Sequence, residues 1–592
     1  MEYPTLRVKN KSRQMIDAFL GYNHNLRIGE NEFYDMQNMT SDYYPVLSTR
    51  AKRGVFPVAD QPNGLISKGE LCRVENGSFI IGDKATVEME LSAGQKTMVS
   101  MGSYVIILPD KKWVNTVPKS EEEYEWYEWG RLEAEFENGG RATLTNCNAN
   151  GYEYENVRNS EDAPDNPANG TIWMDTSSDP VTLKKYFSSS KSWGEIPCYI
   201  KIKASGIADD FEVGDGVYIK GFGVGGSNVV HTLYGCNKDE DYILVKGTYY
   251  NPDPEGDGTE PPGGTIKRKI PDMDFITECN NRLWGCKYGE NGDGVFVNQI
   301  YASKLGDFKN WYCFDEISTD SYTASCGSDG PFTGAITHGG HPLFFKENGV
   351  HKVYGDFPSN FQVQYIPCRG VQEGCHNSLA IVGSTLYYKS RNAVCAYDGS
   401  MPVEISAALG DENYYDAVAG AHGNKYYINM KNVSDGSYWL FVYDAAKGMW
   451  HKEDRIRLYS FCSHLNCLYA IKNETNEVVV LCNAKEFDTD EQSVSWLAET
   501  GIWGMNTPDM KYISRLLIRM ALEDGARVEV SVQYDSNDLW EQVCVISATS
   551  LRSFCIPVRP KRCDHFRIRI SGEGGCKIYS ITKTIEQGSD IS

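Results

Sequence analysis

The stretch NRLWGCKYGENGDGVFVNQIYASKLGDFKNW, residues 281–311, decides the fold class. An apolar segment around Leu283 and Trp284 leads into a glycine-rich turn, and a second apolar segment begins at Val295. Two short apolar runs on either side of a Gly/Asn turn are typical of a β-hairpin. The same pattern returns in GAITHGGHPLFFKENGVHKVYG (334–355) and SLAIVGSTLYYKSRNAVCAYDG (378–399). The chain therefore repeats one hairpin-based unit.

The spacing of these units predicts a β-propeller. Further copies occupy 417–450 and 460–482, and the turn residues before the aromatic strands are His341, Thr385, Lys425 and Cys467. The steps between them are 44, 40 and 42 residues, which is the length of a propeller blade of four short strands, about 40–50 residues. Segments 77–90, 97–115 and 275–303 read as earlier blades, so six to eight blades are expected.

The rest of the chain reads as all-β modules around that propeller. We predict an N-terminal arm at 1–18, a first part of the propeller at 19–115 and a second part at 271–485. The blade-like repeat is absent from 116–270, where acidic and Pro/Gly-rich segments occur, and this predicts one or two inserted β modules. Alternation in RVEVSVQY (527–534) predicts a C-terminal β-sandwich at 486–592. The best helix candidate is the short run DMQNMTSD (35–42).

Charge and composition narrow the classes of partner. The 592 residues include 58 basic and 80 acidic side chains, a net charge of −22, which disfavours tight binding to nucleic acid or to anionic membranes. No apolar run approaches the ~18 residues of a membrane span, and no signal peptide is evident, so synthesis in a cytoplasm is expected. The 18 cysteines are scattered without a CxxC pair, which favours reduced, buried thiols.

No motif assigns a catalytic, cofactor-binding or metal-ligating residue. The glycine pattern GFGVGG (221–226) precedes a strand-like segment rather than the helix that a nucleotide site needs. The segment 253–264 has Gly264 where a calcium loop needs Glu. The pair His338 and His341, and the group Cys462, His464 and Cys467, lack the ligand spacing of zinc sites. Without a hydrolase, protease or Walker signature, we predict that the chain is not an enzyme.

Three basic segments stand out against the acidic background: AKRG (51–54), IKRK (266–269) and RPKRCDHFRIRI (559–570). In the last, Arg567 and Arg569 alternate with apolar residues, which indicates a solvated strand face. A phosphate-binding surface is the alternative interpretation of these segments.

The segment FLGYNHNLRIGENEFYDMQNMTSDYYPVLSTRAKRG (19–54) resembles the opening of virion proteins of tailed bacteriophages. RLWGC…IYASKLGDFKNW, PLFFKENGVHKVYG and LYYKSRNAVCAYDG resemble blades of phage tail nozzle and packaged-DNA stabilisation proteins. The segment 562–590 is similar to the C-terminal module of such proteins. GTIWMDTSSDPVTLKKYFSSSKSW (170–193) is similar to short modules that decorate phage tail and fibre proteins. The resemblance covers 19–115 and 271–480. The 116–270 insertion and the C-terminal sandwich depart from it, so the protein is expected to be either a nozzle or a hub at the tip of a longer tail.

The resemblance implies a structural protein of the virion tail, made in the cytoplasm of a host bacterium. Such proteins form rings, commonly homohexamers, contact portal, adaptor and other tail proteins, and retain packaged DNA while providing its exit channel without binding it specifically. No cofactor is implied. A receptor-binding tail protein that recognises host surface glycans is the alternative, and a glycan-cleaving propeller enzyme is a third. Trp126, Tyr127 and Trp129 are candidates for subunit or glycan contacts.

Overall fold

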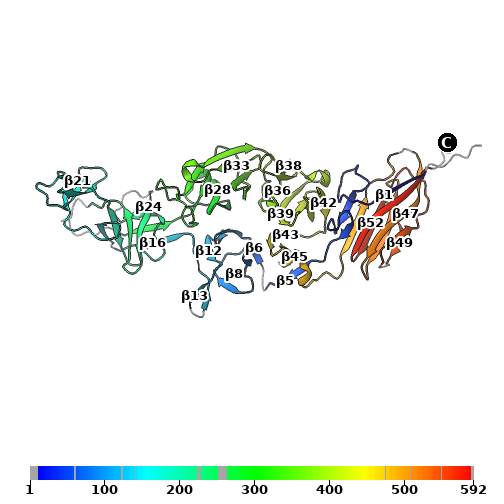
Figure 1. The fold of residues 1–592 in the computed structure, drawn as a ribbon, viewed down its shortest axis with the longest axis horizontal. Helices are drawn as coiled ribbons and strands as arrows, with labels where there is room; N and C mark the ends of the chain where they lie inside the picture. Colours follow the sequence, from blue (N-terminus) through cyan, green and yellow to red (C-terminus); the bar gives the residue numbers. More distant parts are fainter. Residues whose placement is uncertain are drawn as a thin grey trace, which may run out of the picture.

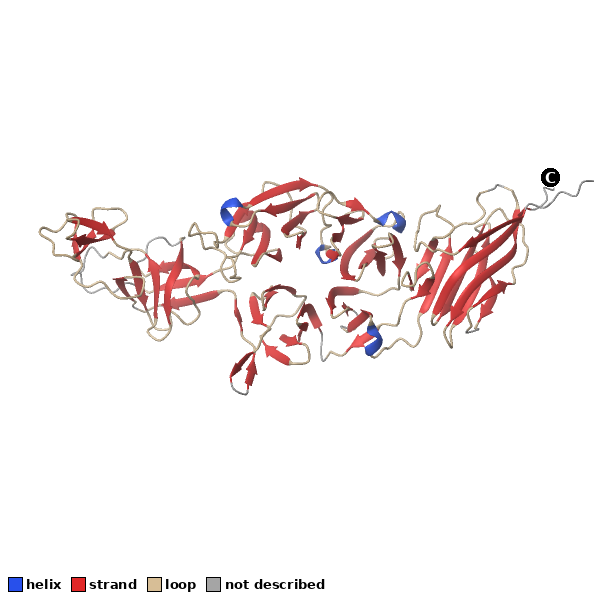
Figure 2. Cartoon of the chain, viewed as in Figure 1, coloured by secondary structure: helices blue, strands red, loops and turns tan. Residues whose placement is uncertain are grey.

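A computed structural model describes residues 11–58, 62–121, 124–140, 142–222, 229–250, 263–473, 475, 477–506, 509–547 and 550–587. Figure 1 shows an elongated molecule in which the inserted module, the propeller and the C-terminal sandwich follow one another along the long axis. Regular structure in these ranges is strand, apart from four one-turn 3-10 helices (Figure 2). These helices are η1 (Pro358–Asn360), η2 (His376–Ser378), η3 (Ser406–Leu409) and η4 (Ala484–Glu486). None of the described helices is long and apolar enough to cross a bilayer.

Seven four-stranded antiparallel sheets of the described residues form the propeller, and we number them as blades 1 to 7 in the chain order of their inner strands. The inner strands are β6 (Pro62–Lys68), β10 (Thr97–Met101), β27 (Phe275–Cys279), β31 (Gly334–His338), β35 (Ala380–Val382), β39 (Tyr414–His422) and β43 (Leu458–His464). The second strands are β7 (Glu70–Glu75), β11 (Tyr104–Leu108), β28 (Arg282–Glu290), β32 (His341–Lys346), β36 (Thr385–Lys389), β40 (Lys425–Asn432) and β44 (Cys467–Lys472). The third strands are β8 (Ser78–Ile81), β12 (Lys112–Asn115), β29 (Phe296–Ala302), β33 (Gly349–Tyr354), β37 (Val394–Tyr397), β41 (Tyr438–Asp444) and β45 (Val478–Cys482). The outer strands are β9 (Ala85–Glu88), β15 (Trp129–Arg131), β30 (Tyr322–Ser325), β34 (Gln362–Pro367), β38 (Val403–Glu404), β42 (Met449–Lys452) and β5 (Gly54–Phe56).

The all-β propeller that the sequence predicts is confirmed. The repeat length was measured between four turn residues. Each of them is the first residue of a second strand: His341 of β32, Thr385 of β36, Lys425 of β40 and Cys467 of β44. The period was readable because each of these strands starts directly after a tight turn and runs through the core with mainly apolar side chains. Trp284 of β28 lies where blades 3 and 4 meet, in one core with Phe344 and with its ring 5.0 Å from that of Phe361.

The ring closes by pairing the two ends of the propeller sequence. In blade 7, β43, β44 and β45 are joined by β5, in which Val55 pairs with Val479. Phe56 then packs edge-on against Tyr469, with ring centroids 5.7 Å apart. Closure of this kind removes the open edge that a linear row of sheets would leave, because the last blade takes its outer strand from the start of the chain.

The insertion begins later than the sequence predicts. Trp129–Arg131 is β15, the outer strand of blade 2, so 116–131 belongs to the propeller, with a hairpin of β13 (Lys119–Glu121) and β14 (Tyr124–Trp126) projecting from it. The inserted module proper is a seven-stranded sheet around its own core. Its order is β16 (Ala134–Asn138), β26 (Gly264–Arg268), β23 (Gly216–Gly221), β24 (Val230–Asn237), β25 (Tyr242–Lys246), β22 (Tyr199–Lys203) and β17 (Thr143–Cys147). A small sheet is set into it and lies at the far end of the molecule: β18 (Arg158–Ser160), β19 (Ile172–Asp175), β20 (Thr182–Phe187) and β21 (Ser192–Glu195).

The C-terminal sandwich is built from both ends of the chain. One sheet contains β3 (Met39–Thr40), β4 (Leu47–Thr49), β52 (Cys576–Gln587), β47 (Lys511–Leu522) and β50 (Arg552–Ile556), and β1 (Lys11–Ile16) pairs with β52. The other sheet contains β2 (Phe33–Gln37), β46 (Ser495–Thr500), β51 (Phe566–Glu573), β48 (Arg527–Tyr534) and β49 (Glu541–Ile546).

Two predictions at the N-terminus are therefore wrong. Residues 11–49 are neither an arm nor propeller, because their strands pair with β52 and β46. The run 35–42 is not a helix: Met36 and Met39 lie in separate strands on either side of Asn38, whose φ is +55°. One left-handed residue between two strands thus imitates a helical spacing of apolar side chains.

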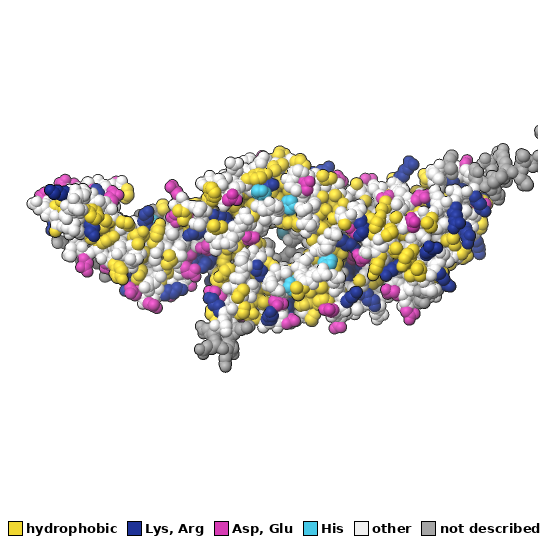
Figure 3. Space-filling model, in the orientation of Figure 1, with side chains coloured by type: hydrophobic (Ala, Val, Ile, Leu, Met, Phe, Trp, Pro, Cys, Tyr) yellow, Lys and Arg dark blue, Asp and Glu magenta, His cyan; other side chains and the backbone are white. Residues whose placement is uncertain are grey.

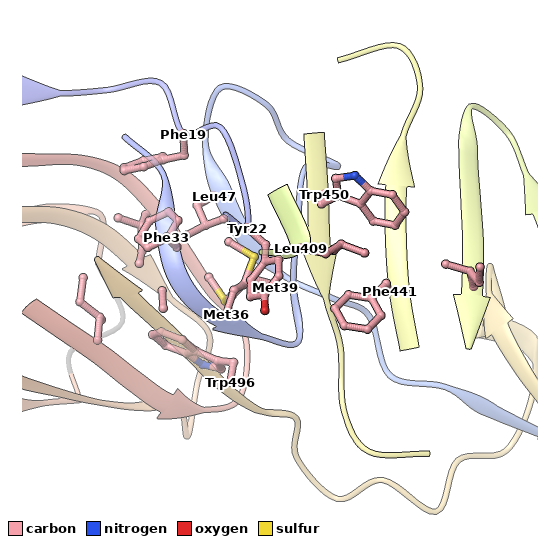
Figure 4. Close-up of a cluster of buried hydrophobic side chains, with 14 of the residues drawn as sticks. Phe19, Tyr22, Phe33, Met36, Met39, Leu47, Leu409, Phe441, Trp450 and Trp496 are labelled. Atoms are coloured by element: carbon pink, nitrogen blue, oxygen red, sulfur yellow. The ribbon is translucent and has the colours of Figure 1, made fainter. Parts of the chain in front are cut away.

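The N-terminal strands also join the sandwich to the propeller. One continuous core contains the sandwich residues Phe33, Met36 and Trp496 together with Phe441 and Trp450 of blade 6. Figure 4 shows these side chains converging at the junction, with Phe19, Tyr22, Met39, Leu47 and Leu409. Arg53 reinforces the link through ion pairs of 2.7 Å with both Glu453 and Asp454.

Candidate functional site

One cavity of the propeller opens at an end of its axis. It has a volume of about 680 Å³ and is lined by blades 1, 5, 6 and 7, and a second cavity of about 240 Å³ continues inward between the inner strands. Figure 3 shows the propeller centre as a hollow. We call the outer cavity the axial mouth. Ligand sites are preferentially concave places where several elements converge, and the mouth meets that description.

A tyrosine, a carboxylate and an arginine from blade 6 and the connection after it form the centre of the axial mouth. The Tyr438 hydroxyl donates a hydrogen bond of 2.5 Å to Asp416 Oδ2, and the Arg457 guanidinium lies 4.8 Å from the Tyr438 ring centroid. The three residues are far apart in sequence and meet because β41 pairs with β40, which in turn pairs with β39.

The backbone positions Asp416 in an unusual way. The register of β39 against β40 shifts between Tyr415 and Val418, so the strand carries a β-bulge at Asp416, and the φ of Asp416 is +49°. Bulges re-aim side chains next to functional sites, and strained backbone is retained where the surrounding structure enforces it. The bulge turns the Asp416 carboxylate toward Tyr438.

The protonation state of the tyrosine limits its chemistry. Burial, followed by the hydrogen bond to Asp416, raises the pKa of Tyr438 to about 12. At neutral pH the phenol is therefore protonated and acts as a hydrogen-bonding group rather than as a phenolate nucleophile. Among the described residues that line the axial mouth, Asp416 is the one carboxylate, whereas most glycosidases place two carboxyl groups around the scissile bond.

The remaining lining is rich in side-chain amides. It includes Asn63, Asn76, Gln95, Asn377 and Asn473. Asn63 Oδ1 is buried and has no hydrogen-bond partner within the described chain. Side-chain amides donate and accept hydrogen bonds in one group, which suits ligands that carry many hydroxyls.

The inner end of the site narrows around His376. The His376 ring lies 5.2 Å from that of Phe275 of blade 3, and burial lowers the pKa of His376. On the other side, the Tyr459 hydroxyl donates to the Pro62 carbonyl, which connects blade 7 to blade 1. Burial raises the pKa of Tyr459 to about 12. The cavity walls are therefore neutral and fixed, and Asp416 and Arg457 supply the charge at the mouth.

A larger cavity, about 1140 Å³, lies between the inserted module and blades 2 and 3. Its charged residues are mostly paired with each other: Lys111 with Glu133 at 2.9 Å, Lys267 with Glu135, and Lys269 with Asp293 at 3.2 Å. These pairs are exposed and join the module to itself and to the propeller, whereas the axial mouth is lined by several blades and holds a buried side-chain oxygen, that of Asn63, without a described partner. We therefore take the axial mouth as the candidate site.

The structure places the metal-like groups of the sequence in structural roles. His338 Nε2 bonds to the Ser384 carbonyl at 2.7 Å and His341 Nδ1 to the Val353 carbonyl at 3.0 Å. His464 Nδ1 bonds to Ser67 Oγ at 2.9 Å. No group of three or more metal-ligating side chains occurs among the described residues. Most of 221–226 and of 253–264 lies outside those residues.

In the three basic segments, carboxylates pair with most of the charges, which leaves less free charge for the phosphate-binding alternative. Arg53 pairs with Glu453 and Asp454, and Arg268 pairs with Asp215 at 2.5 Å. Arg567 and Arg569 both pair with Glu499, at 3.3 and 2.7 Å. Of the aromatic candidates, Trp126 and Trp129 are each 42% exposed, and Tyr127 packs against the core of blades 1 and 2.

Sequence reasoning missed Asp416, Tyr438 and Arg457. Their one local signal is the acidic residue in YYDAVAG (414–420), where the apolar alternation of an inner strand is broken.

Comparisons with known proteins identify no family. No protein-family model matches the chain, and no curated protein matches it. Similar solved structures include the exo-β-1,3-galactanase from Phanerochaete chrysosporium, with 8% identity, a TM-score of 0.22, and 52% of this chain and 94% of that chain covered. A sialidase from Trypanosoma rangeli has 8% identity and a TM-score of 0.23, and covers 96% of this chain and 95% of its own.

These matches to glycoside hydrolases and sialidases contradict the prediction that the chain is not an enzyme, and that prediction is dropped. Their TM-scores of 0.19 to 0.23 are too low to carry an argument for a particular reaction.

Proposed function

We propose that the chain is a tail component of a bacteriophage virion that recognises a host surface glycan through the axial mouth of its propeller. The observation that carries the glycan part is the Asp416–Tyr438–Arg457 group within a rim of side-chain amides. The carboxylate, the guanidinium and the amides offer acceptors and donors to vicinal hydroxyls. The Tyr438 ring has the Arg457 and Lys431 cations 4.8 and 5.6 Å from its centroid and so helps to hold these donors at the mouth.

The virion part rests on the resemblance of 19–54 and of the blade segments to phage tail proteins. Assembly into a ring, contacts with portal and adaptor proteins, and a role in retaining DNA stay predictions. We do not expect the axis of one propeller to serve as the DNA exit, since an inner cavity of about 240 Å³ is only about 8 Å across if it is roughly spherical, and duplex DNA is wider than its major groove of about 12 Å. A DNA channel would have to lie between copies.

The test measures binding of the full chain to purified host cell-wall glycan, with the variants Tyr438→Phe and Asp416→Asn. Each variant keeps the shape of the side chain: Tyr438→Phe removes the donor of the 2.5 Å hydrogen bond, and Asp416→Asn removes the negative charge of its acceptor. We expect binding to weaken by roughly tenfold or more, because the site loses a hydrogen-bonding hydroxyl or its carboxylate charge. Tyr365→Phe, on the outer strand of blade 4, is the control, since its hydroxyl bonds to the Asn348 carbonyl outside the axial mouth.

Unchanged binding of both mouth variants would contradict the glycan site. The same samples are assayed for released reducing sugar, and release that disappears in Asp416→Asn would extend the proposal from recognition to cleavage. Immunogold labelling of intact particles tests the virion part separately: gold away from the tail, or absent from virions, would contradict it.

A further inference from the structure

One face of the sandwich carries three arginines that form no ion pair with any carboxylate in the part of the chain that the structure describes. On the outward face of the sheet β1–β52–β47–β50, Arg13 and Arg515 lie on either side of Thr584, to which both are paired in register. The next row is Met15, Thr582, Leu517 and Cys555, and the third is Ser580, Arg519 and Ser553. We call this surface the arginine face: an apolar row with arginines on both sides.

The arginines of this face are exposed and available. Within the described part of the chain, Arg13, Arg515 and Arg519 form no ion pair, and Arg519 Nε donates to Ser553 Oγ at 3.1 Å. Met15 is 60% exposed between them. Figure 3 shows Lys and Arg side chains gathered over the sandwich end of the molecule. Arginine and methionine are enriched at protein interfaces, where a guanidinium can bind a carboxylate in bidentate fashion.

The opposite end of the molecule has the complementary chemistry. Residues 133–270 contain 22 Asp and Glu against 13 Lys and Arg, whereas 501–592 contain 11 against 12. In the inserted module, Tyr152 is 72% exposed and is followed by exposed Glu153 and Glu155; Glu153 also pairs with Lys201 at 3.5 Å, and its side chain is still 51% exposed. An apolar side chain beside carboxylates matches an apolar row beside arginines. The propeller separates the two ends, so they cannot meet within one chain.

We infer that the arginine face of one copy docks on the acidic surface around Tyr152 of a second copy. The contact is heterologous, joining two different patches, so it leaves one free patch at each end and propagates into an open row or a closed ring. It does not depend on the glycan-binding proposal, because neither patch includes a residue of the axial mouth. Opposite charges at such a contact favour encounter and fix the orientation of the copies.

The experiment is sedimentation velocity of the full chain over a range of concentrations. We expect the wild type to assemble. The face variant Arg13→Glu/Arg515→Glu/Arg519→Glu should weaken assembly roughly thirtyfold or more, as loss of close interfacial charge pairs does. Arg27→Glu/Arg391→Glu/Lys485→Glu, which makes the same charge change at exposed positions elsewhere, should assemble like the wild type. Thermal melting checks that each variant is folded.

A reciprocal variant makes the test specific. Glu153→Lys/Glu155→Lys alone should be monomeric, because its altered end repels the arginine face. Mixed with the face variant it should assemble again, since a Glu-bearing face then meets a Lys-bearing end. A wild type that stays monomeric, a face variant that assembles normally, or a mixture that stays monomeric would each overturn the inference. Arginine-dependent binding of duplex DNA by a monomeric wild type would overturn it in favour of a polyanion site.

Discussion

At the scale of single residues, His451 shows how the junction between propeller and sandwich restricts a titratable group. Its ring is 1% exposed in β42, and neither ring nitrogen has a hydrogen-bond partner within the described residues. Burial, and then the nearby Lys425 charge, lower the pKa of His451 to about 3. The folded protein therefore holds the neutral imidazole well below the pH at which an unfolded chain, with a pKa near 6.5, takes up a proton.

This difference predicts a loss of stability in acid. A folded pKa below the unfolded value contributes stability that is complete above about pH 6.5 and declines as the pH falls toward 3. His451→Phe keeps a ring and removes the titration, so its unfolding midpoint in urea should fall less between pH 7.5 and pH 5 than that of the wild type. Equal losses in the two proteins would show that His451 does not contribute to the acid sensitivity.

At the scale of elements, closure of blade 7 depends on very close packing at β5. A Cβ added at Gly54 would lie 2.6 Å from Phe487 Cβ and 3.1 Å from Ala484 Cβ. Gly54→Ala should therefore destabilise the propeller by about 1–3 kcal/mol, as overpacking does, and raise amide hydrogen exchange in β45, the partner of β5. Gly327→Ala is the matched control, because a Cβ added there would meet no described atom within 4 Å, and it should change stability by less than about 0.5 kcal/mol. Equal melting of the two variants would count against closure by β5.

Strand β5 also shows which part of the fold could be predicted from the sequence and which part could not. Blades were predictable because each one is local: a turn, an apolar strand and another turn repeat within about 40–50 residues. The pairing of Val55 with Val479, or of Leu47 with Ile578, joins segments hundreds of residues apart, and no local pattern identifies the partner. The axial mouth could not be predicted from the sequence for a similar reason. Asp416, Tyr438 and Arg457 become neighbours only through strand pairing and a bulge.

At the scale of the whole molecule, the two additions to the propeller depend on it differently. The inserted module leaves the propeller after β15 of blade 2 and returns to β27 of blade 3. Its first and last strands are adjacent, with Ala134 paired to Arg268, and it has its own core. Its contacts with the propeller are mainly polar, such as Asn310 Nδ2 donating to Asp215 Oδ1 at 2.9 Å and the Lys309–Glu212 ion pair at 2.7 Å. The Tyr218 ring also lies 5.8 Å from that of Tyr312. The sandwich instead takes strands β1–β4 from the N-terminus and shares one core with blades 4 to 6.

Two deletions should therefore have opposite outcomes. Replacing 133–268 with a short Gly/Ser linker should leave a folded propeller and sandwich, destabilised by about 1–3 kcal/mol because Asn310 and Leu132 lose partners. Removing 1–49 should unfold the sandwich, since Phe33, Met36 and Leu47 leave its core and β52 and β46 lose their neighbours. Limited proteolysis with mass spectrometry separates the cases: the first protein should resist cleavage throughout 275–587, and the second should be cut between 495 and 587. A sandwich that resists cleavage without residues 1–49 would show that the C-terminal strands fold alone, and that the N-terminal strands only decorate them.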